Sequence, residues 1–135
     1  MTNFIEIELG GQLRRFKFDM FAVEFFEKEI SARILSNPAI AENPKLAERV
    51  SINCTIYAGL TSDYMLTSKQ VDFTYEDVVD WISKCDEEGK YENVKKICDT
   101  YANTFEYKKW LQEFQDRIQT ILEPDENKKK GKKVK

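Results

Sequence analysis

The chain contains no histidine among its 135 residues. Histidine is the commonest general base in catalysis and the commonest metal ligand, so its absence excludes Ser–His and Cys–His nucleophile pairs and histidine-based metal sites. The sequence also lacks the GxxxxGKS/T and GxGxxG patterns of phosphate-binding loops. These absences predict a protein that is not an enzyme, with no cofactor and with no catalytic, metal-binding or cofactor-binding residues.

Cysteine is also scarce. The three cysteines, Cys54, Cys85 and Cys98, are widely separated and form no CxxC pair. An odd number without paired spacing favours reduced, mostly buried thiols over a disulfide framework or a zinc site. No apolar run is long enough to span a membrane, and the N-terminus lacks the basic and apolar regions of a secretion signal. We therefore expect a cytoplasmic protein without membrane contact.

The net charge is only −3, but it is unevenly distributed along the chain. The last eleven residues, DENKKKGKKVK, contain six lysines and two acids and so carry +4, which leaves −7 on the first 124 residues. An acidic body argues against a nucleic-acid-binding domain. The polar, repetitive end predicts a disordered lysine-rich tail over residues 124–135, after a single globular domain over residues 1–123.

The first predicted elements are two strands over residues 3–9 and 12–18, joined by a tight turn at Gly10-Gly11. Pairing across this turn places Glu6 opposite Arg15 on a polar face. The other face is apolar and consists of Ile5, Ile7, Leu9, Phe16 and Phe18. Two strands cannot form a core alone, so the apolar face must be covered by the rest of the chain or by a partner.

Helical periodicity dominates the remainder of the chain. Three helix starts carry capping signals, namely Asp19, Asn43 before Pro44, and Thr74 in a capping box with Asp77. The predicted helices cover about residues 20–30, 44–58, 75–85 and 91–122. The predicted fold class is therefore α+β and mostly helical, with an N-terminal two-stranded β-hairpin packed on four or five α-helices.

The segments between these helices are predicted to be irregular. Residues 31–43 are small and polar around an Asn-Pro pair, which predicts a loop with at most a short helical turn. Gly59 is a natural stop for the second helix, so residues 60–72 are expected to form a polar connector. Asn103-Thr104 could split the last helix into two.

Apolar stripes on these helices suggest both core packing and partner binding. The aromatic helix over residues 20–30 fits core packing better, as periodic stripes usually do. The amphipathic helix after residue 104 fits equally well a face packed on this chain and a face offered to a partner helix. Apolar residues at 64–66 also require packing or a partner. The candidate partner-binding residues are Phe21, Phe25, Tyr64, Met65, Trp110, Phe114 and Ile118.

Several motifs follow one another in a characteristic order. The IEIELGG hairpin precedes the helix FDMFAVEFFEKE, the next helix ends near Ala58-Gly59-Leu60, and FTYEDVVDWI follows at residues 73–82, before a last helix and a charged tail. In this order the chain resembles the tail assembly chaperones of long-tailed bacteriophages, over about residues 4–115. The longer segment at residues 31–43 and the lysine-rich tail depart from that family's pattern.

The resemblance implies a non-enzymatic protein of a phage or prophage that binds the tape measure protein, keeps it soluble and helps to recruit the tail tube protein. It also implies a site of action in the bacterial host cytoplasm and absence from the mature virion. Two alternatives remain open: a structural or interaction subunit of a phage or mobile-element particle, and a nonspecific nucleic-acid binder acting through the lysine tail. An exposed sheet edge would also allow self-association.

Overall fold

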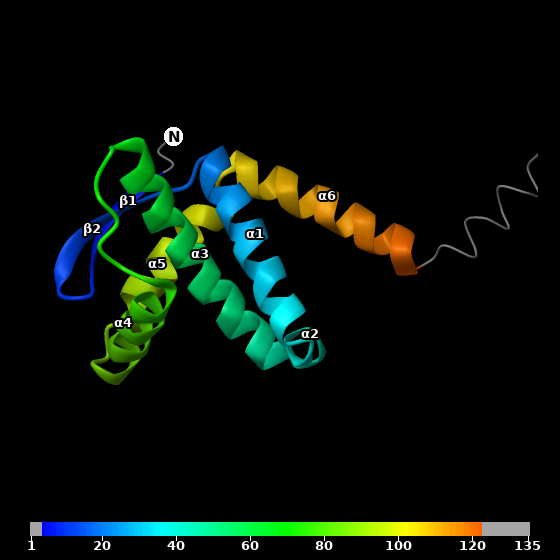
Figure 1. The fold of residues 1–135 in the computed structure, drawn as a ribbon, viewed down its shortest axis with the longest axis horizontal. Coiled ribbons are helices and arrows are strands. Elements are labelled where there is room, and N and C mark those ends of the chain that lie inside the picture. The colour runs from blue at the N-terminus through cyan, green and yellow to red at the C-terminus, as the bar shows by residue number, and fades with distance from the viewer. Residues whose placement is uncertain (1–3, 123–135) are drawn as a thin grey trace, which may run out of the picture.

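A computed structural model describes residues 4–122 of the chain, with side chains described as far as Arg117. The tail predicted over residues 124–135 lies outside the described residues. The elements, drawn in Figure 1, are β1 (Phe4–Leu9), β2 (Gln12–Lys17), α1 (Met20–Ser36), α2 (Ala39–Glu42), α3 (Pro44–Leu66), α4 (Tyr75–Glu87), α5 (Tyr91–Ala102) and α6 (Phe105–Leu122). This confirms a mostly helical α+β fold with an N-terminal hairpin.

The hairpin has the predicted register. The two strands pair antiparallel, with Ile5 opposite Phe16 and Glu6 opposite Arg15. Gly10 and Gly11 both have positive φ angles, which a two-residue turn of this kind requires. Successive side chains of a strand point to opposite faces of the sheet. With this register, the alternate apolar side chains of both strands lie on the same face of the hairpin.

The apolar face of the hairpin is covered by the chain's own helices. Strand β2 packs on α3, and β1 packs on α4 and α5. The Asn93 side chain of α5 donates a hydrogen bond of 3.3 Å to the backbone oxygen of Glu8. The largest fully buried apolar side chains are Leu9, Phe16, Phe18, Ile56, Leu60, Val78, Val94 and Ile97. Each such burial contributes about 2 kcal/mol, so this layer holds the hairpin on the helices.

One charged residue interrupts the apolar face. Arg14 lies opposite Ile7 and is only 5% exposed. Its Nε donates to the Leu9 backbone oxygen at 2.9 Å, and its Nη1 donates to the Tyr64 hydroxyl at 3.0 Å. The guanidinium also lies over the Trp81 ring, 4.1 Å from its centroid. These contacts satisfy a buried cation that would otherwise be costly.

The predicted helix starts are confirmed by their caps. The Asp19 carboxylate accepts a hydrogen bond from the first turn of α1, and Asn43 caps α3 directly before a proline. Thr74 and Asp77 form a reciprocal capping box at the start of α4. Thr104 Oγ1 accepts a hydrogen bond of 3.1 Å from the Tyr107 backbone, which separates α5 from α6. The split predicted at Asn103-Thr104 is therefore present.

Two predicted helix ends are wrong. Helix α1 does not stop near residue 30 but continues to Ser36, and α2 occupies residues 39–42, so most of the predicted 31–43 loop is helical. The extension has a physical reason, because Ile30 and Ile34 lie one turn apart and both pack against the core. The helix ends just before Pro38, whose ring disfavours helical backbone in the preceding residue.

The second correction concerns Gly59, which does not end a helix. Helix α3 runs through it to Leu66, so the predicted connector begins seven residues later than expected. Gly59 is required for packing: a Cβ at this position would lie 2.4 Å from Phe18 Cε1. The absence of a side chain lets the Phe18 ring rest directly on the helix backbone.

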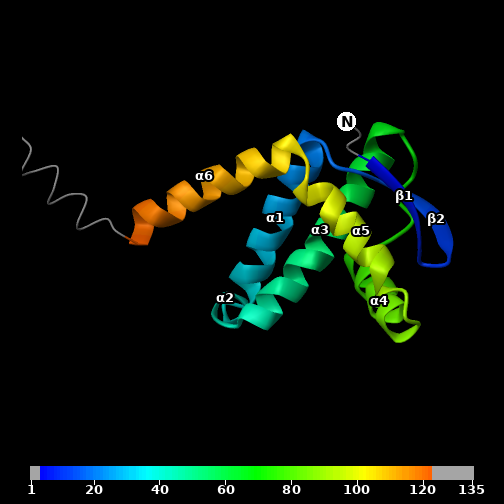
Figure 2. The same ribbon diagram turned by 180° about the vertical axis from the view of Figure 1, so that it is seen from behind.

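Helix α3 is central, and it contacts α1, α2, α4, α5 and β2. Helix α6 is placed differently. Figures 1 and 2 show it running away from the rest of the molecule, and its packing contacts are with α1 and α5. Helix α6 therefore diverges from the body of the protein along its length (Figures 1 and 2).

Candidate partner-binding groove

An apolar groove of about 710 Å³ lies between α6 and residues of α1, α3 and α5. We call it the α6 groove. Its principal apolar lining residues are Phe26, Ile30, Ile52, Tyr107, Trp110 and Phe114. Binding grooves of this size are commonly lined by hydrophobic and aromatic side chains with a few polar groups.

Aromatic side chains join α6 to the body at this groove. The Trp110 ring meets Phe26 of α1 edge to face, with centroids 5.3 Å apart and an interplanar angle of 88°. Tyr107 packs against Tyr101 of α5, with centroids 4.5 Å apart. One turn beyond Trp110, the Phe114 ring stacks on it with centroids 5.0 Å apart, yet remains 39% exposed. These stacked aromatic side chains therefore form a continuous row from the buried Phe26 to the exposed Phe114.

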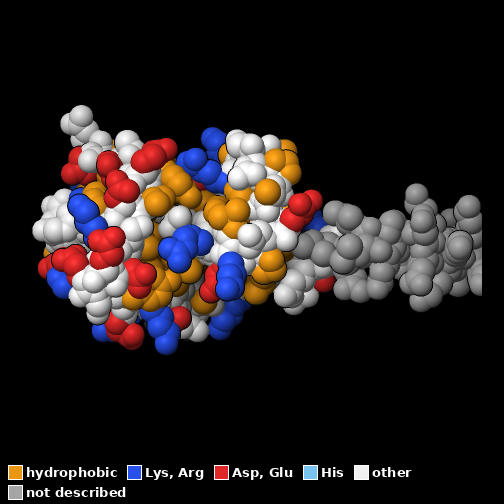
Figure 3. Space-filling model, turned by 90° about the horizontal axis from the view of Figure 1, so that it is seen from below, with side chains coloured by type: hydrophobic (Ala, Val, Ile, Leu, Met, Phe, Trp, Pro, Cys, Tyr) orange, Lys and Arg blue, Asp and Glu red, His pale blue; other side chains and the backbone are white. Residues whose placement is uncertain are grey.

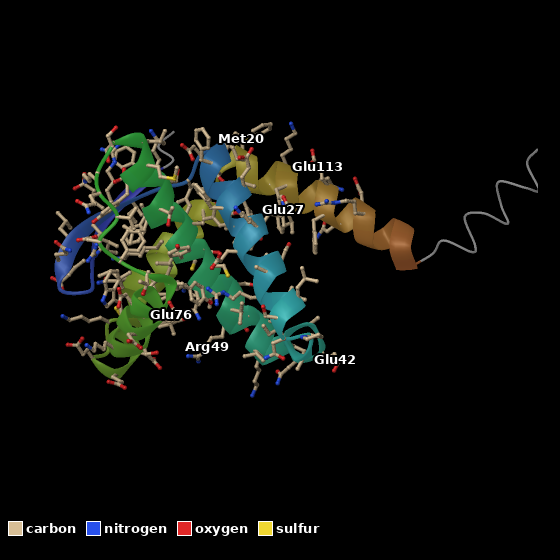
Figure 4. All side chains as sticks on the ribbon, viewed as in Figure 1. Met20, Glu27, Glu42, Arg49, Glu76 and Glu113 are labelled. Carbon is tan, nitrogen blue, oxygen red and sulfur yellow. The ribbon has the colours of Figure 1, made fainter. Side chains whose placement is uncertain are left out.

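Charged groups occur at the edge of the groove. The Trp110 indole Nε1 donates a hydrogen bond of 3.2 Å to Glu27 Oε2, and Arg117 Nη2 lies 3.6 Å from Glu27 Oε1. Figure 4 shows Glu27 on α1 close to α6. Two further acids, Glu48 of α3 and Asp99 of α5, also line the groove and are exposed. The lining thus carries three carboxylates and one guanidinium.

The thiol and phenol groups that line the groove are neutral near pH 7. Burial raises the pKa of the Cys98 thiol to about 12, and the adjacent Asp99 carboxylate adds to this effect. Burial likewise raises the pKa of Tyr101 and of Tyr107 above the ordinary phenol value. These groups therefore add no charge to the apolar part of the lining.

The structure brings together only some of the residues singled out from the sequence. Trp110 and Phe114 both line the α6 groove. Ile118 lies one turn further along α6, and its side chain is outside the described part. On α1, Phe21 is 52% exposed and Phe25 is half-buried against the core, and neither lines the groove.

Tyr64 and Met65 lie at the end of α3, away from the groove lining. The Tyr64 ring packs edge to face on Phe73, with centroids 5.1 Å apart, and its hydroxyl accepts the hydrogen bond from Arg14. Met65 is 59% exposed. Packing within the chain therefore accounts for Tyr64, whereas Met65 and the adjacent Leu66 remain exposed.

Sequence reasoning missed the opposite wall of the groove. Ile30 and Ile34 of α1 line it, but Ile34 fell inside the predicted loop. Ile52 of α3 carried a usable signal, because Ile52 and Ile56 form a second apolar stripe on that helix. Ile56 is buried in the core, whereas Ile52 faces the groove.

A smaller cavity of about 310 Å³ lies beside the hairpin turn. Trp81 of α4 packs on Gly10, where a Cβ would lie 2.5 Å from the indole ring. Lys84, Lys90 and Glu8 lie at its edge, and Lys90 is 3.5 Å from the Glu8 carboxylate. Lys90 and Glu8 therefore pair with each other at this edge of the cavity.

The chain has no match among family models, curated proteins or solved structures. Within residues 4–122, no helix is long and apolar enough to cross a membrane. No cluster of three or more cysteine or acidic side chains in that described part is arranged to hold a metal ion. Figure 3 shows hydrophobic side chains reaching the surface in patches between charged ones on the underside of the molecule. The α6 groove is therefore the leading candidate site.

Proposed function

We propose that the protein is a non-enzymatic phage tail assembly chaperone, which binds and solubilises the tape measure protein and helps to recruit tail tube subunits. The observation that carries the proposal is the α6 groove, which presents the exposed ring of Phe114 beside a wall of aromatic side chains. The ordered motifs that resemble this family supply the identity of the client. Recruitment of tail tube subunits rests on the resemblance alone.

The physical basis of the proposal is recognition of a helix in a groove. A tape measure protein is long and helical, and its apolar stripes aggregate when they lack partners. An amphipathic helix buries such a stripe by laying it into an apolar groove. The first 124 residues of the chaperone carry a charge of −7, which keeps the complex soluble through mutual repulsion.

The test is co-expression with the long coiled-coil protein encoded near this gene. We expect the chaperone to raise the soluble yield of that client and to co-purify with it on a tag. Phe114→Asp should reduce both by about tenfold, because a carboxylate in the groove opposes burial of an apolar side chain. The matched control is Phe21→Asp, which makes the same substitution at an exposed phenylalanine outside the groove.

Two outcomes would count against the proposal. The first is a client whose yield and co-purification do not change with the chaperone present. The second is stoichiometric amounts of this chain in purified particles, measured by mass spectrometry. That result would indicate a structural subunit of the particle instead.

A further inference from the structure

Helix α6 carries its apolar residues at the spacing of a coiled-coil seam. Tyr107, Leu111 and Phe114 are separated by four and then three residues, and all three line the α6 groove. Isoleucines continue the same spacing at positions 118 and 121 of the helix. A repeat of four and three keeps these positions on one face, which suits a second helix lying along α6.

The groove also has an apolar wall opposite this seam. Ile30 and Ile34 of α1 and Ile52 of α3 form that wall. A helix lying along α6 would therefore contact the groove-lining residues of α6 and, at one end, the body of the protein. Helix α6 has 18 residues, so it is roughly 27 Å long, and a partner helix of about 20 residues would match it.

Two occupants from this chain fit the groove poorly. Residues 123–135 include only Pro124 and Val134 as apolar side chains, which is too little to fill an apolar groove. A second copy would bring together two acidic bodies, each with −7 on its first 124 residues, and the repulsion disfavours that contact. A partner of different composition fits better.

The charge at the edge of the groove defines that composition. Arg117 already pairs with Glu27, whereas Glu48 and Asp99 form no ion pair with any basic side chain of residues 4–117. We propose that the α6 groove binds one amphipathic α-helix whose apolar residues recur at heptad spacing and whose flanking residues are lysine or arginine. The inference rests on the proposed function for the client's identity, but the groove's preference can be measured without the client.

The experiment uses two synthetic 21-residue helices with leucine at the heptad core positions. One has lysine at the flanking positions and the other has glutamate there. We expect the lysine helix to bind the full chain roughly fivefold to tenfold more tightly in calorimetric titration at low salt, since two exposed charge pairs form. The difference should shrink as salt screens these pairs.

Charge reversal provides the matched variants. Glu48→Lys combined with Asp99→Lys should abolish or invert the preference for the lysine helix. Asp80→Lys combined with Glu87→Lys changes the net charge equally on α4, which does not line the groove, and should leave the preference intact. Thermal unfolding of each variant checks that the protein remains folded.

Several results would overturn the inference. Equal affinity for both helices would remove the charge preference. Binding that survives Phe114→Asp would place the site elsewhere. A dimer in sedimentation analysis that Phe114→Asp dissociates would show that a second copy fills the groove. Peptide binding without rescue of the tape measure protein would instead remove the chaperone role and leave this inference standing.

Discussion

Gly59 lies inside α3, where the Phe18 ring rests against the helix. A Cβ at residue 59 would lie 2.4 Å from Phe18 Cε1, and the Phe18 side chain is fully buried and so cannot move away easily. We expect Gly59→Ala to lower the free energy of unfolding by about 1–3 kcal/mol. The steric cost of overpacking outweighs the roughly 1 kcal/mol that alanine gains over glycine in a helix. Urea denaturation measures the difference.

A double-mutant cycle isolates the Phe18 contact in this prediction. Phe18→Leu, which shortens the buried side chain, should cost less stability in the Gly59→Ala background than in the unmodified protein. Equal costs in both backgrounds, or a Gly59→Ala protein that is more stable than the original, would contradict the packing role of this glycine.

The Cys98 thiol is expected to make stability depend on alkaline pH. Its pKa is about 12 in the folded protein, above the ordinary value of 9.0, because burial disfavours the thiolate. The folded state therefore holds the proton more tightly, so its stabilising effect is complete below pH 9 and is lost between pH 9 and 12. A single group contributes a slope of at most about 1.4 kcal/mol per pH unit.

The measurement is the free energy of unfolding from pH 7 to pH 11. The decline above pH 9 should be shallower in Cys98→Ala than in the unmodified protein. Cys54 has the same raised pKa of about 12, so part of the decline should remain in that variant. An unchanged slope in Cys98→Ala would show that folding does not raise the pKa of this thiol.

At the scale of elements, the sequence predicted where helices begin better than where they end. The caps at Asp19, Asn43 and Thr74 depend on side chains within three residues of the helix start, so local sequence specifies them. The ends of α1 and α3 depend on distant contacts. Gly59 illustrates the difference, because its role depends on a ring 41 positions earlier in the chain. No local pattern contains that information.

The hairpin was predictable in register for a similar reason. A two-residue turn at Gly10-Gly11 fixes which residues pair, and alternation then fixes which face is apolar. Arg14 is the exception. The hairpin register places it opposite Ile7, but the burial of its side chain depends on Tyr64 of α3 and Trp81 of α4.

At the scale of the whole molecule, only one wall of the α6 groove was predictable. Trp110 and Phe114 lie on an amphipathic helix whose stripe is visible in the sequence. The facing wall comes from α1, α3 and α5, and their side chains meet only after the core has formed. Periodicity marks which residues face inward or outward on one helix, but it does not specify which helices border the same groove.

Deleting the lysine-rich end distinguishes the proposed chaperone function from nonspecific nucleic-acid binding. Deleting residues 125–135 removes six lysines and two acids and changes the net charge from −3 to −7. We expect the shortened chain to solubilise its client as well as the full chain does, because the α6 groove is intact. Any binding to a 30-nucleotide single strand should disappear, since that binding depends on the lysines and weakens with salt.

The comparison requires the same co-expression assay for three chains: the full protein, the shortened protein and Phe114→Asp. If the α6 groove binds the client, the soluble yield of the client falls with Phe114→Asp and is unchanged by the deletion. The reverse pattern, with yield lost on deletion and retained in Phe114→Asp, would assign function to the lysines and would overturn the groove as the binding site. Because the two variants change different physical properties, apolar area and positive charge, a single assay distinguishes the two surfaces.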